Sequence, residues 1–377
     1  MKGKQGMVCM GLLLVLSSCH TGKQITASGL QRKDFQTEVN GQHTDLFTLS
    51  NKQGMEVCIT NYGARVVSIL VPDRNGKRED VVCGFSTITE YMEQRQNFGS
   101  TVGRYIGRIL NARFTLDGVE YKLVPNNGKS GHISHGGNPG FADRMWKVEQ
   151  ADTHRVCLSY LSPDGENGFP GNLKVTLVYS LGEDDNALDL TYEATTDAPT
   201  VLNLSHHSFF NISGNFTKSV EDQQLWVDAD RFTPYDDKKC VTGEYLPVAG
   251  TPLDFRMPHA IGECIDADHP QLKVVNGYDH TWELNTKGDD TRPAAWVYDP
   301  ASGRKMEIFT TEPGMQIYTG NGLKGKMTGK RGIAYPFRSA VCFETMHFQD
   351  SPNQPGFPST VLRPGEVFRS HTVYKFE

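Results

Sequence analysis

The chain has 377 residues and a net charge of −6, with acidic and basic residues interspersed, so no basic stripe is available for binding a nucleic acid. Its 38 glycines and 19 prolines are spread along the whole sequence, as expected for a fold with many turns. Beyond the N-terminal segment, no apolar run approaches the roughly 20 residues that a membrane-spanning helix needs.

The N-terminus has the features of an export signal. Two lysines precede an apolar run over residues 7–16, which is too short to span a bilayer. The following LSSC resembles the lipobox of bacterial lipoproteins, in which the cysteine, here Cys19, is lipidated; an ordinary cleaved signal is the alternative. Serine before the cysteine is a variant of the usual Gly or Ala. We expect an exported bacterial lipoprotein, anchored to the membrane on the periplasmic or cell-surface side. It would consist of a signal peptide (1–18), a flexible tether (19–40) and a folded domain (41–377).

Period-two alternation of apolar and polar residues predicts many short β-strands. Residues 174–181 (KVTLVYSL) and 187–195 (ALDLTYEAT) flank a polar turn and predict a hairpin. The pairs Asp117-Gly118 and Asn75-Gly76 mark two further hairpins. Helical periodicity is confined to residues 88–96. Other strand-like segments are 55–71, 113–124, 305–311 and 340–348. The pattern predicts an all-β domain of two large packed sheets.

Six cysteines follow Cys19. None has the paired close spacing of a zinc site. Four lie within apolar, strand-like runs, which predicts buried free thiols rather than a disulfide framework. These four are Cys58, Cys83, Cys157 and Cys342.

Polar residues in apolar or glycine-rich surroundings are candidates for a site. Arg108, in GRYIGRILNARF, must find a partner or reach a cleft, and an ion pair between strands is the alternative. His135 precedes Gly136-Gly137, where a ligand can approach the backbone closely, although a tight loop would also explain it. The spacing of these glycines is not that of a dinucleotide site.

Three further stretches carry ionisable groups. His206 and His207, in NLSHHSFFNI, are adjacent strand residues, so they are expected to point to opposite faces. Asp279, in NGYDH, is a site candidate, with a turn-forming role as the alternative. Glu344, in VCFETMHF, lies among strongly apolar residues, where burial raises a carboxyl pKa and favours a general base.

Six motifs occur in one order and resemble those of the aldose 1-epimerase (galactose mutarotase) family: GRYIGRI, HGG, NLSHHSFFN, NGYDH, EPGMQIYTGN and FETMHFQDSPNQPGFP. The similarity runs from Phe47 to Phe376. It implies a large antiparallel β-sandwich with an open sugar-binding cleft, no cofactor and no metal.

The resemblance also implies residue roles. Glu344 and His207 match the family's catalytic pair, and the matched sugar ligands are Arg108, His135, Asp279 and Gln316. Gly107 and His206 stand where the family usually has Asn, which puts the sugar preference in doubt.

The implied activity is interconversion of the α and β anomers of free hexoses such as glucose and galactose. Ionised Glu344 would take the proton of the C1 hydroxyl while protonated His207 donates to the ring oxygen. We expect a sugar substrate, membrane contact through the lipid anchor, no nucleic-acid partner, and a monomer or weak dimer. Among the aromatic residues, Tyr278 is expected to line the cleft.

Two alternatives remain at this point. The first is an exported sugar-binding lipoprotein without catalysis. The second is a carbohydrate-active enzyme of the same fold that acts on another sugar, for example a glycosidase that pairs Asp279 with Glu344.

Overall fold

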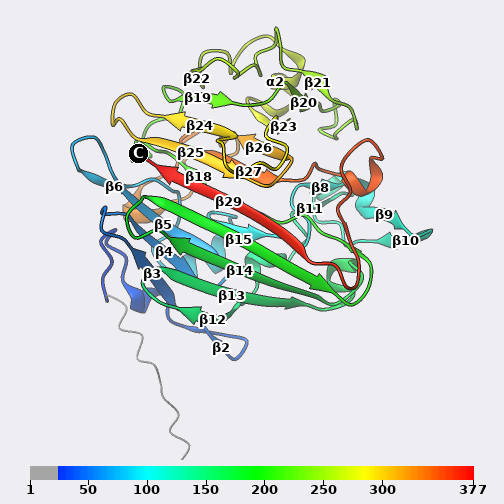
Figure 1. Ribbon diagram of the computed structural model, residues 1–377, viewed down its shortest axis with the longest axis horizontal. Coiled ribbons are helices and arrows are strands. Elements are labelled where there is room, and N and C mark those ends of the chain that lie inside the picture. Colours follow the sequence, from blue (N-terminus) through cyan, green and yellow to red (C-terminus); the bar gives the residue numbers. More distant parts are fainter. Residues whose placement is uncertain (1–23) are drawn as a thin grey trace, which may run out of the picture.

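The computed structural model describes residues 24–377 (Figure 1), and two large antiparallel sheets dominate this part of the chain. Within these residues the larger sheet has nine strands. Their spatial order is β12 (Lys147–Ala151), β13 (Arg155–Ser162), β14 (Leu173–Leu181), β15 (Ala187–Thr196), β29 (Phe368–Phe376), β25 (Lys305–Thr310), β24 (Ala295–Tyr298), β19 (Gln224–Val227) and β22 (His259–Ala260).

The second sheet carries most of the chemistry described below. In the described residues it has six strands, in the order β18 (Phe209–Phe210), β27 (Val341–Met346), β26 (Gly314–Tyr318), β23 (Asp279–Glu283), β20 (Arg231–Thr233) and β21 (Leu246–Pro247).

Smaller elements complete the described part of the chain. A four-stranded sheet contains β3 (Leu46–Ser50), β4 (Glu56–Thr60), β5 (Arg65–Pro72) and β6 (Arg78–Asp80). The strand pairs are β1 (Glu38–Val39) with β2 (Gln42–His43), β7 (Ser100–Val102) with β17 (Ser205–His207), β8 (Arg108–Ile109) with β11 (Ile133–Ser134), β9 (Arg113–Leu116) with β10 (Val119–Lys122), and β16 (Thr200–Val201) with β28 (Val361–Leu362). The α-helices are α1 (Ile88–Gln94) and α2 (Pro270–Val275), and the 3-10 helices are η1 (Arg32–Phe35), η2 (Leu110–Ala112), η3 (Gly128–Ser130), η4 (Phe141–Asp143), η5 (Glu166–Gly168), η6 (Lys330–Gly332) and η7 (Ser351–Asn353).

The main hydrophobic core lies between the two large sheets. On β14 every second residue is buried, as Leu177 illustrates, and the residues between are more exposed. On β27 all six residues are buried. Val341 and Phe343 belong to the core. Glu344 follows Phe343 on the same strand, so its side chain points to the opposite face of the sheet. That opposite face of the six-stranded sheet lines the candidate site.

The strand predictions are confirmed where the pattern was local. The hairpin of β14 and β15 pairs in continuous register, and hairpins follow from the turns at Asp117-Gly118 and Asn75-Gly76. The short helical stretch is α1, which begins with a capping box formed by Thr87 and Glu90. The sandwich prediction is therefore confirmed.

The six cysteines of residues 24–377 are free thiols, as predicted. Cys58, Cys83 and Cys342 are buried, as predicted. Cys157, which was also predicted to be buried, is half-buried, as are Cys240 and Cys264.

The segment assigned to a tether differs from the prediction over residues 24–40. Phe35, in η1, is fully buried and Leu30 is nearly so, and both belong to a hydrophobic cluster with Tyr62. Ser28 donates a backbone hydrogen bond to Glu56 on β4. The tether prediction is wrong for these residues, because their apolar side chains pack against the hydrophobic cluster that contains Tyr62. The proposed signal peptide and Cys19 lie outside the described residues.

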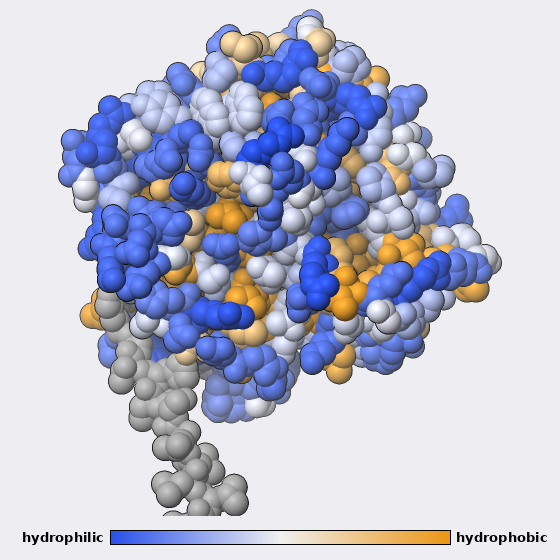
Figure 2. Space-filling model, in the orientation of Figure 1, coloured by the Kyte–Doolittle hydropathy of each residue, from blue (hydrophilic) through white to orange (hydrophobic). Residues whose placement is uncertain are grey.

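Within residues 24–377 no helix is both long and apolar enough to span a membrane. The face of the molecule drawn in Figure 2 is mainly hydrophilic, and its hydrophobic residues form small separate groups.

Candidate active site

A cavity of about 240 Å³ opens on the face of the six-stranded sheet that points away from the core. The residues predicted to form the site all line it, namely Arg108, His135, His207, Asp279, Gln316 and Glu344. These residues come from β8, β17, β23, β26 and β27 and from the residue after β11. The tertiary structure thus brings six residues from distant parts of the chain to one small cavity.

Strand register fixes the floor of the cavity. Glu344 on β27 stands directly opposite Gln316 on β26. The Gln316 amide donates from Nε2 to Oδ1 of Asp279 on β23, over 2.6 Å. Its Oε1 accepts a hydrogen bond from the Thr281 hydroxyl. The Gln316 side chain is therefore held in one orientation between the two carboxyl groups.

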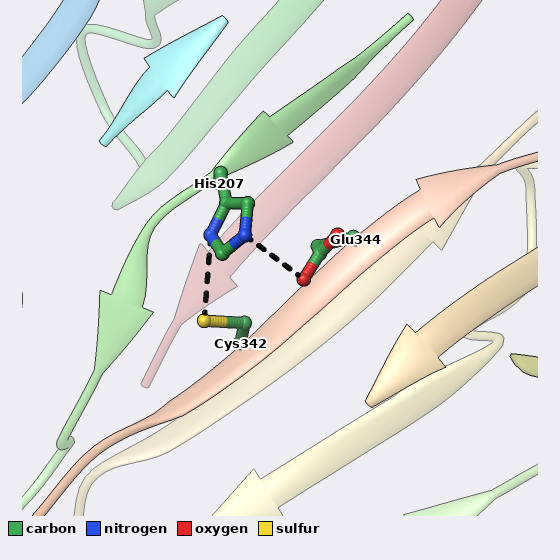
Figure 3. Close-up of side chains that lie close together, drawn as sticks. All are labelled: His207, Cys342 and Glu344. Atoms are coloured by element: carbon green, nitrogen blue, oxygen red, sulfur yellow. Dashed lines mark hydrogen bonds and ion pairs between the residues drawn. The ribbon is translucent and has the colours of Figure 1, made fainter. Parts of the chain in front are cut away.

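His207 faces Glu344, with 3.4 Å between Nε2 and Oε1 (Figure 3). Both residues are buried, with exposed fractions of 6% and 4%. Burial raises the pKa of Glu344 well above its usual value, and nearby Asp279 adds to this effect. Burial also lowers the pKa of His207 well below its usual value, with neighbouring His135 contributing. The pair therefore retains one proton, which either group can carry, over a wide range of pH.

The ring of His207 is held by two contacts. It stacks on Phe209, with ring centroids 5.0 Å apart and an interplanar angle of 17°. Its Nδ1 lies 3.6 Å from Sγ of Cys342 (Figure 3). Burial raises the pKa of the Cys342 thiol well above its usual value, so the thiol stays protonated. The two ring nitrogens of His207 thus face different partners, the thiol of Cys342 and the carboxyl group of Glu344.

His206 points to the other face of β17, as predicted. Its Nε2 lies 2.6 Å from the Ser208 hydroxyl, and the ring packs beside Tyr179 and Tyr374. Burial lowers its pKa to about 3, so the ring is neutral. His206 is a residue of the core, not of the cavity.

Arg108 and His135 form the opposite wall. Their strands pair through Arg108 and Ser134. The backbone N–H of Gly107 donates to Nδ1 of His135, over 3.4 Å, which leaves Nε2 as the protonated nitrogen of the neutral ring. Burial and Arg108 lower the pKa of His135 to about 4, so the ring is a neutral hydrogen-bond donor at physiological pH.

Arg108 does not form the strand-tying ion pair considered from the sequence. Within residues 24–377 its guanidinium has no ion-pair partner, and it lines the cavity. Arg104, by contrast, is buried and donates to the backbone carbonyls of Pro170, Gly171 and Ser162. Arg104 is thus a structural residue, whereas Arg108 is free to meet a ligand.

The family model described as aldose 1-epimerase matches residues 45–375, which include all six cavity residues named above. The chain belongs to the aldose 1-epimerase family.

Similar proteins include the galactose mutarotase of Sus scrofa, 39% identical over 330 residues, which are 88% of this chain and 93% of that protein. The aldose 1-epimerase of Escherichia coli K12 is 36% identical over 340 residues, covering 89% and 96% of the two chains. The crystal structure of a GalM/aldose epimerase homologue from C. elegans superposes with a TM-score of 0.81 at 31% identity, covering 89% of this chain and 99% of that one. The galactose 1-epimerase from Lactobacillus acidophilus NCFM gives a TM-score of 0.79 at 28% identity, with coverage of 90% and 96%.

Some cavity residues of this family member escaped the sequence analysis. Tyr318 lies two residues after Gln316 on β26, so strand alternation could have placed it on the same face. The prediction that Tyr278 lines the cavity is wrong. It is fully buried, and its hydroxyl donates to the carbonyl of Pro252.

Gln349 is another cavity residue that was not predicted from the sequence. It is buried against the cavity, and its Nε2 donates to the Tyr235 hydroxyl (2.7 Å) and to Oε1 of Gln316 (3.3 Å). A Cβ atom at Gly107 would lie only 2.5 Å from Cγ of Gln349. Gly107 therefore leaves the room that this glutamine fills. No local pattern in the sequence indicates this pairing.

One group of side chains among residues 24–377 has the composition of a metal site. The ligand atoms of His207, Cys342 and Glu344 lie within 4.8 Å of one another. The imidazole, however, meets sulfur through one nitrogen and the carboxyl group through the other (Figure 3). A metal ion would have to displace one of these contacts.

Proposed function

We propose that this protein is an aldose 1-epimerase that interconverts the α and β anomers of free hexoses such as glucose and galactose, with Glu344 and His207 as its catalytic residues. The observation that carries the proposal is the opposed pair itself. A buried carboxyl group and a buried imidazole lie 3.4 Å apart in a cavity of about 240 Å³, whose other lining residues are mostly polar.

Anomer exchange requires one proton to leave the C1 hydroxyl and another to reach the ring oxygen, so that the C1–O5 bond breaks. Glu344, as carboxylate, accepts the hydroxyl proton while the electron pair of the O–H bond forms the aldehyde C=O. The electrons of the C1–O5 bond move to O5, which takes a proton from His207. Rotation about C1–C2 presents the other face of the aldehyde, and reversal of the proton transfers closes the ring as the other anomer.

The shared proton of the pair suits this cycle. Ring opening moves a proton from C1–OH to Glu344 and another from His207 to O5, so the pair gains one proton and loses one. The protein therefore needs no proton from solvent during a turnover. Burial raises the pKa of Glu344 and lowers that of His207, so the carboxyl group can hold a proton and the imidazole can give one up in the course of the cycle.

The remaining residues would hold the pyranose between acid and base. Arg108 and His135 are donors on one wall, and Asp279 is an acceptor on the other, oriented by Gln316. Binding through several hydroxyls fixes the ring so that C1 and O5 stay at the pair, which lowers the entropic cost of reaction.

Polarimetry tests this activity. Freshly dissolved α-glucose or α-galactose should reach its equilibrium rotation faster with purified protein than in buffer alone. Unchanged rates with both sugars would contradict the proposal.

We further propose that residues 1–18 are an export signal and that Cys19 is lipidated, so that the enzyme is held at a membrane surface. The support is the sequence pattern alone. Replacing Cys19 with Ala should move the protein from the membrane fraction to the soluble fraction, and unchanged membrane association would count against lipidation.

A further inference from the structure

A second polar cleft, here called the side cleft, adjoins the catalytic cavity. Its volume of about 290 Å³ is similar to the cavity's 240 Å³. The two share three wall residues, Asn97, Ser134 and His135. The ring of His135 lies 5.5 Å from that of His207, centroid to centroid. A substituent on a sugar oxygen beside His135 would therefore lead directly into the side cleft.

The side cleft offers hydrogen-bonding groups that the protein itself does not use. The side chains of Asn97, Asn127 and Asp143 form no hydrogen bond or ion pair within the described part of the chain. The amide of Asn138 accepts only a long contact of 3.4 Å from Arg95. Amides both donate and accept, as sugar hydroxyls do, so these groups match a polyhydroxylated ligand.

Other amides hold the walls of the side cleft in place. Asn167 donates from Nδ2 to the carbonyls of Gly136 (2.8 Å) and Pro139 (2.9 Å). Asn126 pairs with both backbone groups of Ser134, at 2.7 and 2.9 Å. The cleft thus exists before a ligand arrives, which reduces the entropic cost of binding.

The charge and shape of the side cleft favour a neutral sugar ring. Arg95 and Asp143 are its two charged lining residues and have opposite signs. A phosphate group would need more positive charge than one exposed arginine supplies. Gly137, Gly140 and Ala142 also line the cleft and leave space for the flat apolar face of a pyranose.

We propose that the side cleft is a subsite for the second sugar of a reducing disaccharide, whose reducing-end pyranose occupies the catalytic cavity. The inference rests on the proposed function, because C1 of the reducing sugar must lie free at Glu344 and His207. The second sugar is therefore attached through a non-anomeric hydroxyl near His135. Its own anomeric carbon is locked in the glycosidic bond and takes no part in the reaction.

The test compares mutarotation of α-lactose and β-maltose with that of α-glucose. Asn127 lines the side cleft but not the catalytic cavity, so Asn127→Trp places a ring in the cleft without replacing a cavity residue. Lys129→Trp places the same ring on the same turn outside the cleft. For at least one of the two disaccharides, Asn127→Trp should lower kcat/KM about tenfold, because several hydrogen bonds are lost, and leave the value for glucose unchanged. Lys129→Trp should change neither. Equal effects of Asn127→Trp on glucose and on both disaccharides, or no effect on either disaccharide, would overturn the subsite.

Calorimetry separates this inference from the proposed function. In Glu344→Gln, the better disaccharide should bind more tightly than its reducing-end monosaccharide, and adding Asn127→Trp should abolish the difference. This result would support the subsite even if the wild-type protein failed to accelerate mutarotation of glucose, a failure that would count against the proposed catalysis alone. Equal binding of disaccharide and monosaccharide would reject the subsite.

Discussion

The imidazole of His207 and the carboxyl group of Glu344 face each other across 3.4 Å, although they belong to strands of different sheets. β17 pairs with β7, and β27 lies between β18 and β26 in the six-stranded sheet, yet the two strands pack together. The site depends on this contact between sheets.

Removing either member of the pair should abolish most of the activity. Glu344→Gln and His207→Asn each lose a group that transfers a proton in both half-reactions, which is worth about 10²–10⁴-fold in kcat. Polarimetry measures the loss. The midpoint temperature of thermal unfolding of Glu344→Gln should be no lower than that of the wild type, because a neutral amide is easier to bury than an ionisable carboxyl group.

The exposed residues Glu120 and His154 provide matched controls for this pair. Glu120→Gln and His154→Asn should retain wild-type rates. Full activity in Glu344→Gln or His207→Asn would show that the roles are assigned wrongly.

The acid limb of the pH profile of kcat/KM should lie below the range of an ordinary histidine. The pair gains a second proton only below the lowered pKa of His207, and it loses its only proton only above the raised pKa of Glu344. The acid limb should therefore lie well below pH 6.5, the ordinary value for histidine. An acid limb with its inflection near pH 6.5 would contradict the lowered pKa of His207.

The protein should lose stability in mild acid. Burial lowers the pKa of His206 and His280 to about 3 and that of His135 to about 4. Between pH 6.5 and these values the unfolded chain binds protons that the folded chain does not bind. The free energy of unfolding therefore decreases as the pH is lowered. The slope is about 1.4 kcal/mol per pH unit for each histidine. Urea unfolding at pH 7 and pH 5 measures the difference.

His206→Asn removes one of these titrating groups, and it should reduce the loss between pH 7 and pH 5 even if it lowers stability at both pH values. His154→Asn, at an exposed position, should leave the loss as in wild type. A loss unchanged by His206→Asn would argue against this origin of the acid sensitivity.

Gln349→Leu should weaken sugar binding more than catalysis. The leucine keeps the volume beside Gly107 but cannot donate to Tyr235 or Gln316, so Gln316 holds Asp279 less firmly. Loss of one such hydrogen bond costs about 1 kcal/mol, which predicts a KM roughly fivefold higher at similar kcat. Gln150→Leu, at an exposed position on β12, is the control. A kcat that falls while KM stays constant would mean that Gln349 acts on the reaction itself.

Local sequence patterns predicted much of the architecture. The alternation in KVTLVYSL and ALDLTYEAT and the turn between them specify β14 and β15, because a strand's side-chain period and its turn chemistry involve only neighbouring residues. The same alternation assigned His207 and His206 to opposite faces. It also marked Glu344 as a polar residue in a buried strand.

Other features depend on contacts between distant segments. Phe35 and Leu30 show no pattern that distinguishes a tether from a packed extension, and only the cluster around Tyr62 shows them to be buried. The space that Gly107 leaves for Gln349 is invisible until β8 and the segment after β27 lie side by side.

The sequence by itself thus determined the strands, the faces of their side chains and, through resemblance, the family. Only the tertiary structure decided which polar groups meet in one cavity, how far apart acid and base lie, and that a second cleft opens beside them. The physical reason is the distance along the chain over which each interaction acts. Alternation and turns are set by residues close in the chain, whereas distances and burial in the cavity are set by the pairing order of strands and the packing of sheets.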